Sequence, residues 1–470
     1  SNSFCTLLGA AMLWCAKPVQ EAPPAPTFDP TRHYAEIARE ALPAATALGG
    51  AMVLGSSGLT TSVLAAPAFL WAQRSLIRGR AVSPVKSLES ARRVKDMERK
   101  NVVVTGASSG IGAQLAVQFA LMGANVIGVC RRHPDEARAY VDDTVARQWV
   151  GGHPMKRSIL MSRIRFAHAD FNSLDHVKRL VAETSQAEWA TPNEKGVGGL
   201  HVLVNAAGVM EAGAPARTLE GMERHLQVNY LAPFMLTEGL APIIAHARDD
   251  AGFVGGRVIN VISSSHVAIP DAAKARAMME DGARFGGDDG TDVRLESEPC
   301  DEAKGKAIER YALSKLLQIC HSDSLAARGI CSACVSPGPA LTGIYRTTAP
   351  WLSGWAARNV VQALAVKTPA EASATAYDCA LMDDLVNGGY YADGKQRAGR
   401  SALACDAAFR EEAVQWALHQ AGMRDPAALS DDERDAARPH SLLYRRRDGE
   451  FRARSHQRRP VLMPPSMLRP

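Results

Sequence analysis

Strand-length apolar runs alternate with helix-length segments from Asn101 onward, and this rhythm constrains the fold more than any other feature of the chain. The runs are VVVTG, NVIGV, IRFAHAD, HVLVNAAG, RVINVIS and GICSACVSP. Strands separated by segments long enough for a helix form βαβ units, in which the strands run parallel and helices cover both faces of the sheet. The sequence therefore predicts an α/β fold with a doubly wound parallel sheet.

This pattern occupies only the middle of the 470 residues. We expect an N-terminal extension over 1–99, an α/β domain over 100–422 and a basic tail over 423–470. Asp281 to Ala303 is rich in glycine and acidic residues and has no periodicity, so we interpret it as an excursion from the domain.

The N-terminal extension contains an apolar stretch from Ala41 to Gln73 without a charged side chain. As a helix it is long enough to cross the roughly 30 Å of a bilayer core. Its Gly, Ser, Thr and Pro content makes it only weakly hydrophobic, so a helix packed on a partner protein is the alternative. If the stretch spans a membrane, the cytoplasmic or matrix side is marked by Arg74, Arg78, Arg80 and Lys86.

Charge and cysteine content bound the class of protein. The net charge of +5 is concentrated in the tail, which contains nine arginines and two acidic residues between Ala436 and Pro470. Because the rest of the chain is nearly neutral, we expect no nucleic-acid partner. Nine cysteines in a chain this long are too sparse for a disulfide framework and indicate a reducing compartment. Cys331 and Cys334 form a CxxC within a strand-like run, where they face opposite sides, so we assign no metal site.

A glycine-rich turn follows the first strand-like run. Its sequence is TGASSGIG, and the helical pattern AQLAVQFALMG comes next. Such glycines let backbone amides and a helix N-terminus approach a pyrophosphate, which is typical of a Rossmann-like dinucleotide site. The residues assigned to this cofactor site are Thr105, Gly106, Ser108, Ser109, Gly110, Ile111 and Gly112.

The second strand-like run ends in Arg131 and Arg132, where an NAD site normally has an acid for the adenosine ribose. Two arginines can instead hold a 2′-phosphate through charge-assisted hydrogen bonds, so we expect NADP(H) rather than NAD(H). Asp170 ends the third run, where it can meet the adenine amino group or form the turn into the next helix.

Tyr311 and Lys315 are four residues apart, which places both side chains on the same face of a helix. The lysine cation can stabilise a phenolate, so Tyr311 can transfer a proton. Ser263 ends a buried strand-like run and can donate a hydrogen bond to a substrate carbonyl; Ser264 is the nearest alternative. Asn229 lies among apolar residues, and its amide needs partners, either a catalytic water or a structural hydrogen bond.

Together the motifs TGASSGIG, NAAG, VNY, YALSK and SPG, with Ser263, resemble the short-chain dehydrogenase/reductase family. The resemblance implies that Ser263 orients the carbonyl, Tyr311 is the acid or base, Lys315 also holds the nicotinamide ribose, and Asn229 positions a water. It adds a group of cofactor residues: Asn205, Ala206, Ala207, Gly208, Pro337, Gly338 and Thr342. The family usually has NNAG at 205–208, so one amide contact that steadies the sheet is in doubt here.

Within the family the chain is most similar to retinol-dehydrogenase-like reductases over about residues 100–422, judged by LEGMERHLQVNYLAPFMLT and RVINVISSSH. The similarity implies an NADP(H)-dependent oxidoreductase for a retinoid-, steroid- or lipid-like alcohol or carbonyl. It also implies a membrane-associated location, organellar or in the endoplasmic reticulum. We expect Ile344 to Leu364 to form a lid.

A second interpretation is an accessory subunit of a membrane-bound complex, in which the fold is a docking body with a retained nucleotide. It depends on residues 1–80 and the basic tail, which look unable to fold alone and could bind a membrane or membrane proteins.

Overall fold

The computed structural model describes residues 97–151, 153–191, 193, 197–211, 216–248, 255–283, 300–340, 342–345 and 367–423, without the side chains of 300–306 and 345. The apolar stretch 41–73, nearly all of the expected lid and the basic tail lie outside these residues. The described residues thus belong to the α/β domain and its immediate ends.

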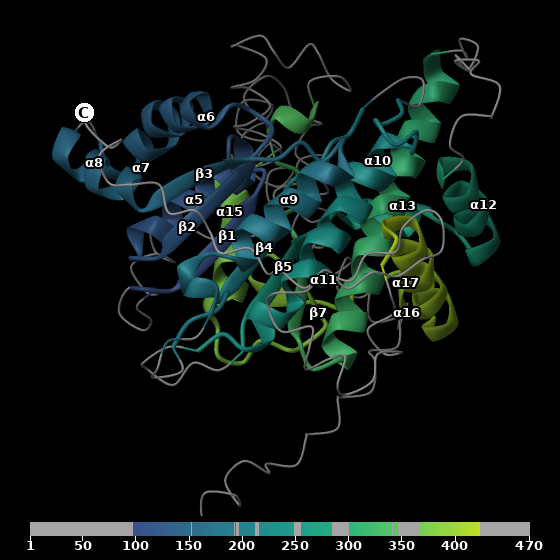
Figure 1. The fold of residues 1–470 in the computed structure, drawn as a ribbon. Coiled ribbons are helices and arrows are strands. Elements are labelled where there is room, and N and C mark those ends of the chain that lie inside the picture. Colours follow the sequence, from purple (N-terminus) through teal and green to yellow (C-terminus); the bar gives the residue numbers. More distant parts are fainter. Residues whose placement is uncertain are drawn as a thin grey trace, which may run out of the picture.

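An eight-stranded sheet forms the centre of the domain, in the order β3-β2-β1-β4-β5-β6-β7-β8 (Figure 1). Every neighbouring pair is parallel except β7 and β8, which are antiparallel. The strands are β1 (Asn101–Thr105), β2 (Asn125–Cys130), β3 (Ile164–His168), β4 (Val202–Asn205), β5 (Arg257–Val261), β6 (Cys331–Ser336), β7 (Gly389–Ala392) and β8 (Lys395–Gln396). The strand order reverses between β1 and β4, and a crevice at the carboxyl ends of the strands is expected at such a point.

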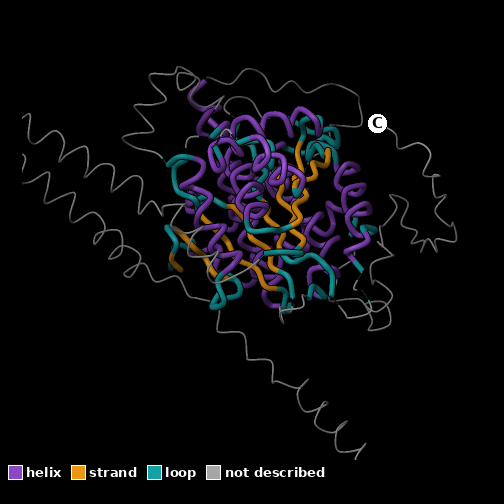
Figure 2. Tube along the Cα trace, turned by 90° about the vertical axis from the view of Figure 1, so that its left-hand side faces the viewer, coloured by secondary structure: helices purple, strands orange, loops and turns teal. Residues whose placement is uncertain are grey.

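Helices cover both faces of this sheet (Figure 2). The main helices are α5 (Gly110–Leu121), α6 (Pro134–Val141), α7 (Arg147–Val150), α8 (Pro154–Ser162), α9 (Leu174–Ser185), α10 (Arg224–Leu226), α11 (Ala232–Ala245), α12 (Ala272–Ala283), α13 (Cys300–Ala327), α15 (Pro369–Leu381), α16 (Ala402–Cys405) and α17 (Ala407–Ala421). Short turns of other helix types are η2 (Asp142–Ala146), η3 (Glu188–Ala190), η4 (Gln227–Leu231), η5 (Ser264–Ala268) and η6 (Gly343–Tyr345). The apolar core is accordingly split into two clusters. One holds α5 and α15, and the other holds α9, α11 and α13.

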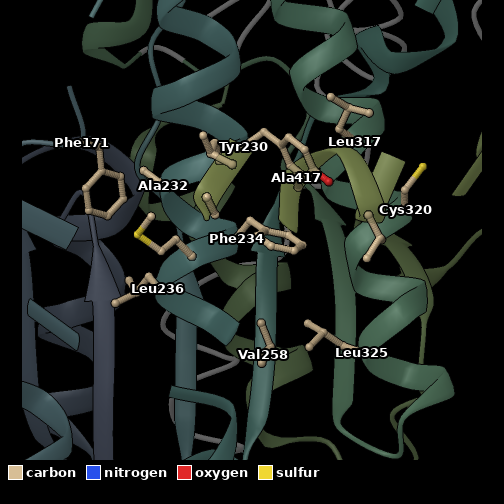
Figure 3. Packing of buried hydrophobic residues seen from close by; sticks show 14 of the residues in the cluster. Phe171, Tyr230, Ala232, Phe234, Leu236, Val258, Leu317, Cys320, Leu325 and Ala417 are labelled. Carbon is tan, nitrogen blue, oxygen red and sulfur yellow. The ribbon is translucent and has the colours of Figure 1, made fainter. Parts of the chain in front are cut away.

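The cluster that holds α9, α11 and α13 fixes the position of α13, the helix that contains Tyr311 and Lys315. Tyr230 and Phe234 lie 5.9 Å apart between ring centroids, and the Tyr230 hydroxyl donates to the Ala413 carbonyl of α17. Figure 3 shows both rings with Leu317 and Cys320 of α13 in this packed layer. Since side chains in such a layer interdigitate with few voids, α13 is held at a fixed angle to the sheet.

A π-helical turn, η4, interrupts the helix that runs from α10 to α11. The whole stretch Arg224–Ala245 is long and apolar enough to cross a membrane, but 83% of its apolar window is buried inside the domain. Among the described residues it is the one helix of this kind, and it packs as a core helix.

All six predicted strands are present, and the doubly wound sheet is confirmed as mostly parallel. Two features differ from the expectation. The edge strands β7 and β8 were not predicted, because β7 is only four residues long and β8 two. The proposed excursion over 281–303 is also too long, since α12 extends to Ala283 and the backbone of α13 begins at Cys300.

Candidate active site

A cavity of about 470 Å³ lies at the carboxyl ends of the parallel strands. Segments that follow β1, β2, β3, β4, β5 and β6 form its walls. The predicted residues that line it are Gly106, Ser108, Ser109, Gly110, Ile111, Gly112, Arg131, Arg132, Asp170, Ala206, Ala207, Gly208, Ser263, Tyr311, Lys315, Pro337, Gly338 and Thr342. Residues distributed over more than 200 positions of the sequence therefore face one space.

The turn between β1 and α5 has the backbone shape that a pyrophosphate site needs. Gly106 and Gly110 have φ of 69° and 57°, in the left-handed region that favours glycine. A Cβ on Gly112 would collide with the carbonyl oxygen of Gly106, so only glycine fits there. Ser109 precedes α5, and within the described structure its side chain makes no capping hydrogen bond. The first amides of α5 thus stay available to an anion.

Two predicted cofactor residues, Thr105 and Asn205, are not in the cavity wall. Thr105 is fully buried, and its Oγ1 accepts hydrogen bonds from the amides of Ala206 and Ala207, both at 3.0 Å. Asn205 donates from Nδ2 to Thr237 Oγ1 at 3.0 Å and to Asn260 Oδ1 at 2.9 Å. Both side chains brace the loop after β4 and the sheet beneath it, because they lie one layer below the wall. The amide of Asn205 itself supplies a contact between β4 and β5 of the kind that the NAAG sequence had put in doubt.

The two arginines after β2, Arg131 and Arg132, also line the cavity. The Arg132 guanidinium sits 5.0 Å from the ring centroid of Tyr140, an aromatic residue that the sequence interpretation missed. Asp170 forms a local turn, since its Oδ1 accepts from both the backbone amide and Nδ2 of Asn172. The turn-forming alternative therefore holds for Asp170, which also lines the cavity.

Tyr311 and Lys315 lie on one face of α13, as their spacing predicted. The Lys315 Nζ is 5.6 Å from the centroid of the Tyr311 ring, and both side chains are almost completely buried. Nζ donates to the carbonyl oxygen of Val261 at 3.1 Å and to Oε1 of Gln318 at 2.9 Å. Burial lowers the pKa of Lys315 to about 7, since desolvation disfavours its cation.

Ser263 follows β5 and precedes η5. Its Oγ accepts from the Ser265 amide at 3.2 Å, which fixes the start of this short helix. Behind it, the fully buried His266 donates from Nδ1 to the Ser263 carbonyl at 2.8 Å and accepts the Ser401 amide on Nε2 at 3.2 Å. A ring nitrogen that accepts from an amide carries no proton, so this contact places the proton of His266 on Nδ1. Ser264 also lines the cavity.

Asn229 lies on the π-helical turn η4 and is fully buried, outside the cavity wall. Its Oδ1 accepts from the Val209 amide at 2.7 Å, while Nδ2 donates to the Val209 carbonyl at 2.9 Å and to Ser314 Oγ at 3.1 Å. The structural alternative for its side chain is thus present. The amide joins η4, the loop after β4 and α13.

The Pro337-Gly338 turn after β6 rests on a buried ion pair that the sequence did not reveal. Lys367 donates from Nζ to the Pro337 carbonyl at 3.0 Å and to Asp393 Oδ1 at 2.6 Å, and its side chain is 3% exposed. Gly338 has φ of 74°, and a Cβ there would lie 3.3 Å from that ammonium. No motif marks Lys367, because its partners come from two distant strand ends.

Comparison with known proteins shows which proteins the chain resembles. Residues 100–271 match the family model described as short chain dehydrogenase. The Arabidopsis thaliana protein "Dehydrogenase/reductase SDR family member FEY" is 32% identical over 251 residues, 52% of this chain and 55% of that protein, so the chain spans just over half of this relative. Human polyprenol dehydrogenase is 27% identical over 301 residues, 62% of this chain and 75% of its own. Human retinol dehydrogenase 13 is 27% identical over 308 residues, 64% and 78% of the two chains.

Residues 100–271 are thus similar to the short-chain dehydrogenases, and the proteins that the chain resembles include retinol and polyprenol dehydrogenases.

Proposed function

We propose that this protein is an NADP(H)-dependent oxidoreductase that interconverts an alcohol and a carbonyl on a lipophilic substrate. The observation that carries the proposal is the shared cavity, in which the glycine-rich turn and the Ser263, Tyr311 and Lys315 side chains line the same space. Carbonyl reduction needs a dinucleotide site beside a phenol that donates a proton, an ammonium that stabilises the phenolate and a hydroxyl that donates to the carbonyl oxygen.

Several residues of the cavity wall support the proposal of a bound dinucleotide. The uncapped start of α5 suits the pyrophosphate, and the positive φ of Gly106 and Gly110 keeps that backbone close. Pro337, Gly338 and Thr342 would flank the nicotinamide, and the loop over 206–208 would lie beside it. Lys315 donates two hydrogen bonds to described residues, so a third ammonium proton suits a ribose hydroxyl.

When bound, the reduced nicotinamide supplies a hydride, which carries both electrons to the carbonyl carbon of the substrate. The Ser263 hydroxyl donates a hydrogen bond to the carbonyl oxygen as negative charge develops there. The phenol of Tyr311 gives its proton to that oxygen, and the Lys315 ammonium stabilises the phenolate that remains. Asn229 holds the helix turn and the loop that border this path, and we assign it the relay of a replacement proton through water. In the oxidation direction each transfer reverses.

NADP(H) rather than NAD(H) is supported by the charge at the adenosine end. Arg131 and Arg132 follow β2 and line the cavity, and the nearby Tyr140 ring faces the Arg132 guanidinium. A 2′-phosphate would meet two cations there, and the described residues between β2 and β3 add no acid to the cavity wall that could accept hydrogen bonds from ribose hydroxyls.

A lipophilic substrate is supported by two observations. The relatives named above are dehydrogenases of polyprenol and retinol. Val267 and Ile308 are about half exposed, on η5 and on the turn of α13 before Tyr311, two elements that pack against each other. Apolar surface beside a site suits an apolar ligand or a membrane surface. Membrane contact through 1–80 and the basic tail is part of the same proposal, and so is an organellar or endoplasmic reticulum location. The accessory-subunit alternative depended on the same terminal segments, which lie outside the described residues.

The proposal is tested first by titrating the purified protein with NADPH and NADH and following nicotinamide fluorescence. We expect NADPH to bind more tightly. The double change Arg131→Ala with Arg132→Ala should weaken NADPH binding by about 10² to 10⁴-fold, because each charge-assisted pair contributes about 1.5 to 3 kcal/mol, and should leave NADH binding nearly unchanged. Arg147→Ala, which removes an exposed arginine from α7, is the matched control. Equal loss for both cofactors would refute the assignment of the arginines, and absence of binding would refute the function.

A further inference from the structure

Lys315 is buried at a site that disfavours its protonated, charged form. Its side chain is 3% exposed, and burial is the largest influence on its protonation. A neutral amine cannot stabilise a phenolate at Tyr311, so the proposed chemistry needs something nearby that favours the cation. Within the described structure two oxygen atoms do so, the Val261 carbonyl and Oε1 of Gln318.

Gln318 lies one turn after Lys315 on α13 and is itself 3% exposed. The orientation of its amide is set by its neighbour, because only the oxygen can accept from an ammonium. Its Nε2 is then buried without a hydrogen-bond partner among the described residues. An unpaired buried amide N–H costs about 1 to 3 kcal/mol, so an apolar side chain of similar size would suit this position better if packing were its only purpose.

We propose that Gln318 is a positioning residue whose amide oxygen holds the Lys315 ammonium in place and favours its protonated form beside Tyr311. The hydrogen bond stands on geometry alone, whereas its service to Tyr311 rests on the proposed function. Gln318 acts through Lys315 and not on a ligand, since it does not line the cavity.

Among the residues that the structure describes, few other titratable groups face Lys315. Tyr311 lies on the same helix, and Cys334 on β6 is a neutral thiol, because burial raises its pKa to about 12. The histidines on neighbouring elements are engaged elsewhere: His225 of α10 with Glu223 and the Glu211 amide, and His266 of η5 with Ser263 and Ser401. A change in acceptor strength at 318 should therefore act on Lys315 directly.

The test tracks the proton in the full chain without cofactor. The pKa of Lys315 is about 7 when folded, against 10.5 for an ordinary lysine. The unfolded state thus binds more protons between these values, so the free energy of unfolding gains a contribution that rises with pH from about 7 to 10.5. Denaturant titrations across this range measure that rise for the wild type, Gln318→Met and Gln318→Glu.

The two variants should shift the rise in opposite directions. Gln318→Met removes the acceptor and should move the start of the rise down by about one pH unit, whereas Gln318→Glu adds a carboxylate and should move it up by about one unit or more. In a Lys315→Met background neither change should alter the pH dependence. Gln415→Met and Gln415→Glu, at an exposed glutamine of α17, are the matched controls. A common shift for both Gln318 variants, or none, would overturn the proposal.

A second readout separates this inference from the proposed function. In carbonyl reduction, the alkaline loss of kcat should come at lower pH in Gln318→Met and at higher pH in Gln318→Glu. If the unfolding curves shift as expected while the protein neither binds NADPH nor turns over, the hydrogen bond stands and the function fails. If turnover is normal and neither readout shifts, the function stands and Gln318 is only a packing residue.

Discussion

In the proposed mechanism, proton transfer depends on one hydroxyl group, that of Tyr311. Tyr311→Phe removes this group but keeps the ring, which packs edge-on against His225 at 6.4 Å between centroids. We expect kcat to fall by about 10² to 10⁴-fold, the usual contribution of a general acid, while the Kd for NADPH changes by no more than about 2-fold. Steady-state kinetics and fluorescence titration measure the two quantities.

Tyr140→Phe is the matched control, since it keeps the aromatic face below Arg132. A Tyr311→Phe enzyme with more than about a tenth of wild-type kcat would show that another group supplies the proton.

The sequence could predict residues whose relation is local. Tyr311 and Lys315 share a helix face because of their spacing, and the glycine turn is contiguous in the chain. The sequence could not reveal Gln318, because an amide three residues after a lysine is common on helices. Only the burial of Gln318 beside Lys315 distinguishes it from such amides. Thr105 and Asn205 belong to the predicted cofactor motifs, yet their side chains lie below the cavity wall. Whether a side chain reaches the cavity depends on how the neighbouring strands end, which the sequence does not show.

At the scale of elements, the Lys367 and Asp393 pair joins the start of α15 to the turns after β6 and β7. Lys367→Met leaves Asp393 without its cation and the Pro337 carbonyl without a donor. We expect a loss of about 3 kcal/mol in the free energy of unfolding, together with weaker NADPH binding, because the Pro337-Gly338 turn loses its support.

The double change Lys367→Met with Asp393→Asn should recover part of this stability, since the unpaired charge is gone, but not the cofactor affinity. Denaturation and NADPH titration distinguish the two effects. Full recovery of binding in the double variant would mean that the ion pair does not shape the turn.

A second buried group joins α11 to α13. Burial alone would raise the pKa of Glu238, but the hydrogen bond with His321 and the charge of Arg328 outweigh it and lower that pKa to about 2. Burial also lowers the pKa of His321, against its bond to Glu238. Both groups bind protons more readily when unfolded, so stability should fall as the pH drops below about 6.5 and again from about 4.5 towards 2.

Glu238→Gln should cost about 3 kcal/mol at pH 7, because Arg328 loses its charge partner, and should abolish the second acid phase. Urea titrations from about pH 7 to 3 test this. An unchanged acid phase would assign that phase to other carboxylates.

Over the whole molecule, His266 connects parts of the site that are far apart in the chain. His266→Asn can still donate to the Ser263 carbonyl but cannot reach the Ser401 amide, whereas His266→Phe loses both bonds. We expect kcat to fall by about 10-fold in the phenylalanine variant and less in the asparagine variant, with similar Kd for NADPH, since unpaired buried groups cost about 1 to 3 kcal/mol each. Equal kcat in the two variants would show that the bond to Ser263 does not position the serine.

The architecture of the molecule was predictable because most of the strands β1 to β6 are largely apolar runs, as parallel buried strands are, whereas β3 at the edge of the sheet alternates in burial. The edge of the sheet formed by β7 and β8 was not predictable, because both strands are short and begin beside glycines. The π-helical turn η4 was also invisible, because five residues of altered pitch leave the apolar pattern of the surrounding helix unchanged.

The bond from the Ser401 amide to His266 also bears on synthesis. The nascent chain leaves the ribosome with its N-terminus first, so the glycine-rich turn and Tyr311 emerge well before Ser401 does. A growing chain can close its first parallel strands early, but the support behind Ser263 must wait until about 135 further residues have been added after His266. Competence for chemistry should therefore arrive last, and abruptly, as the end of the domain leaves the ribosome.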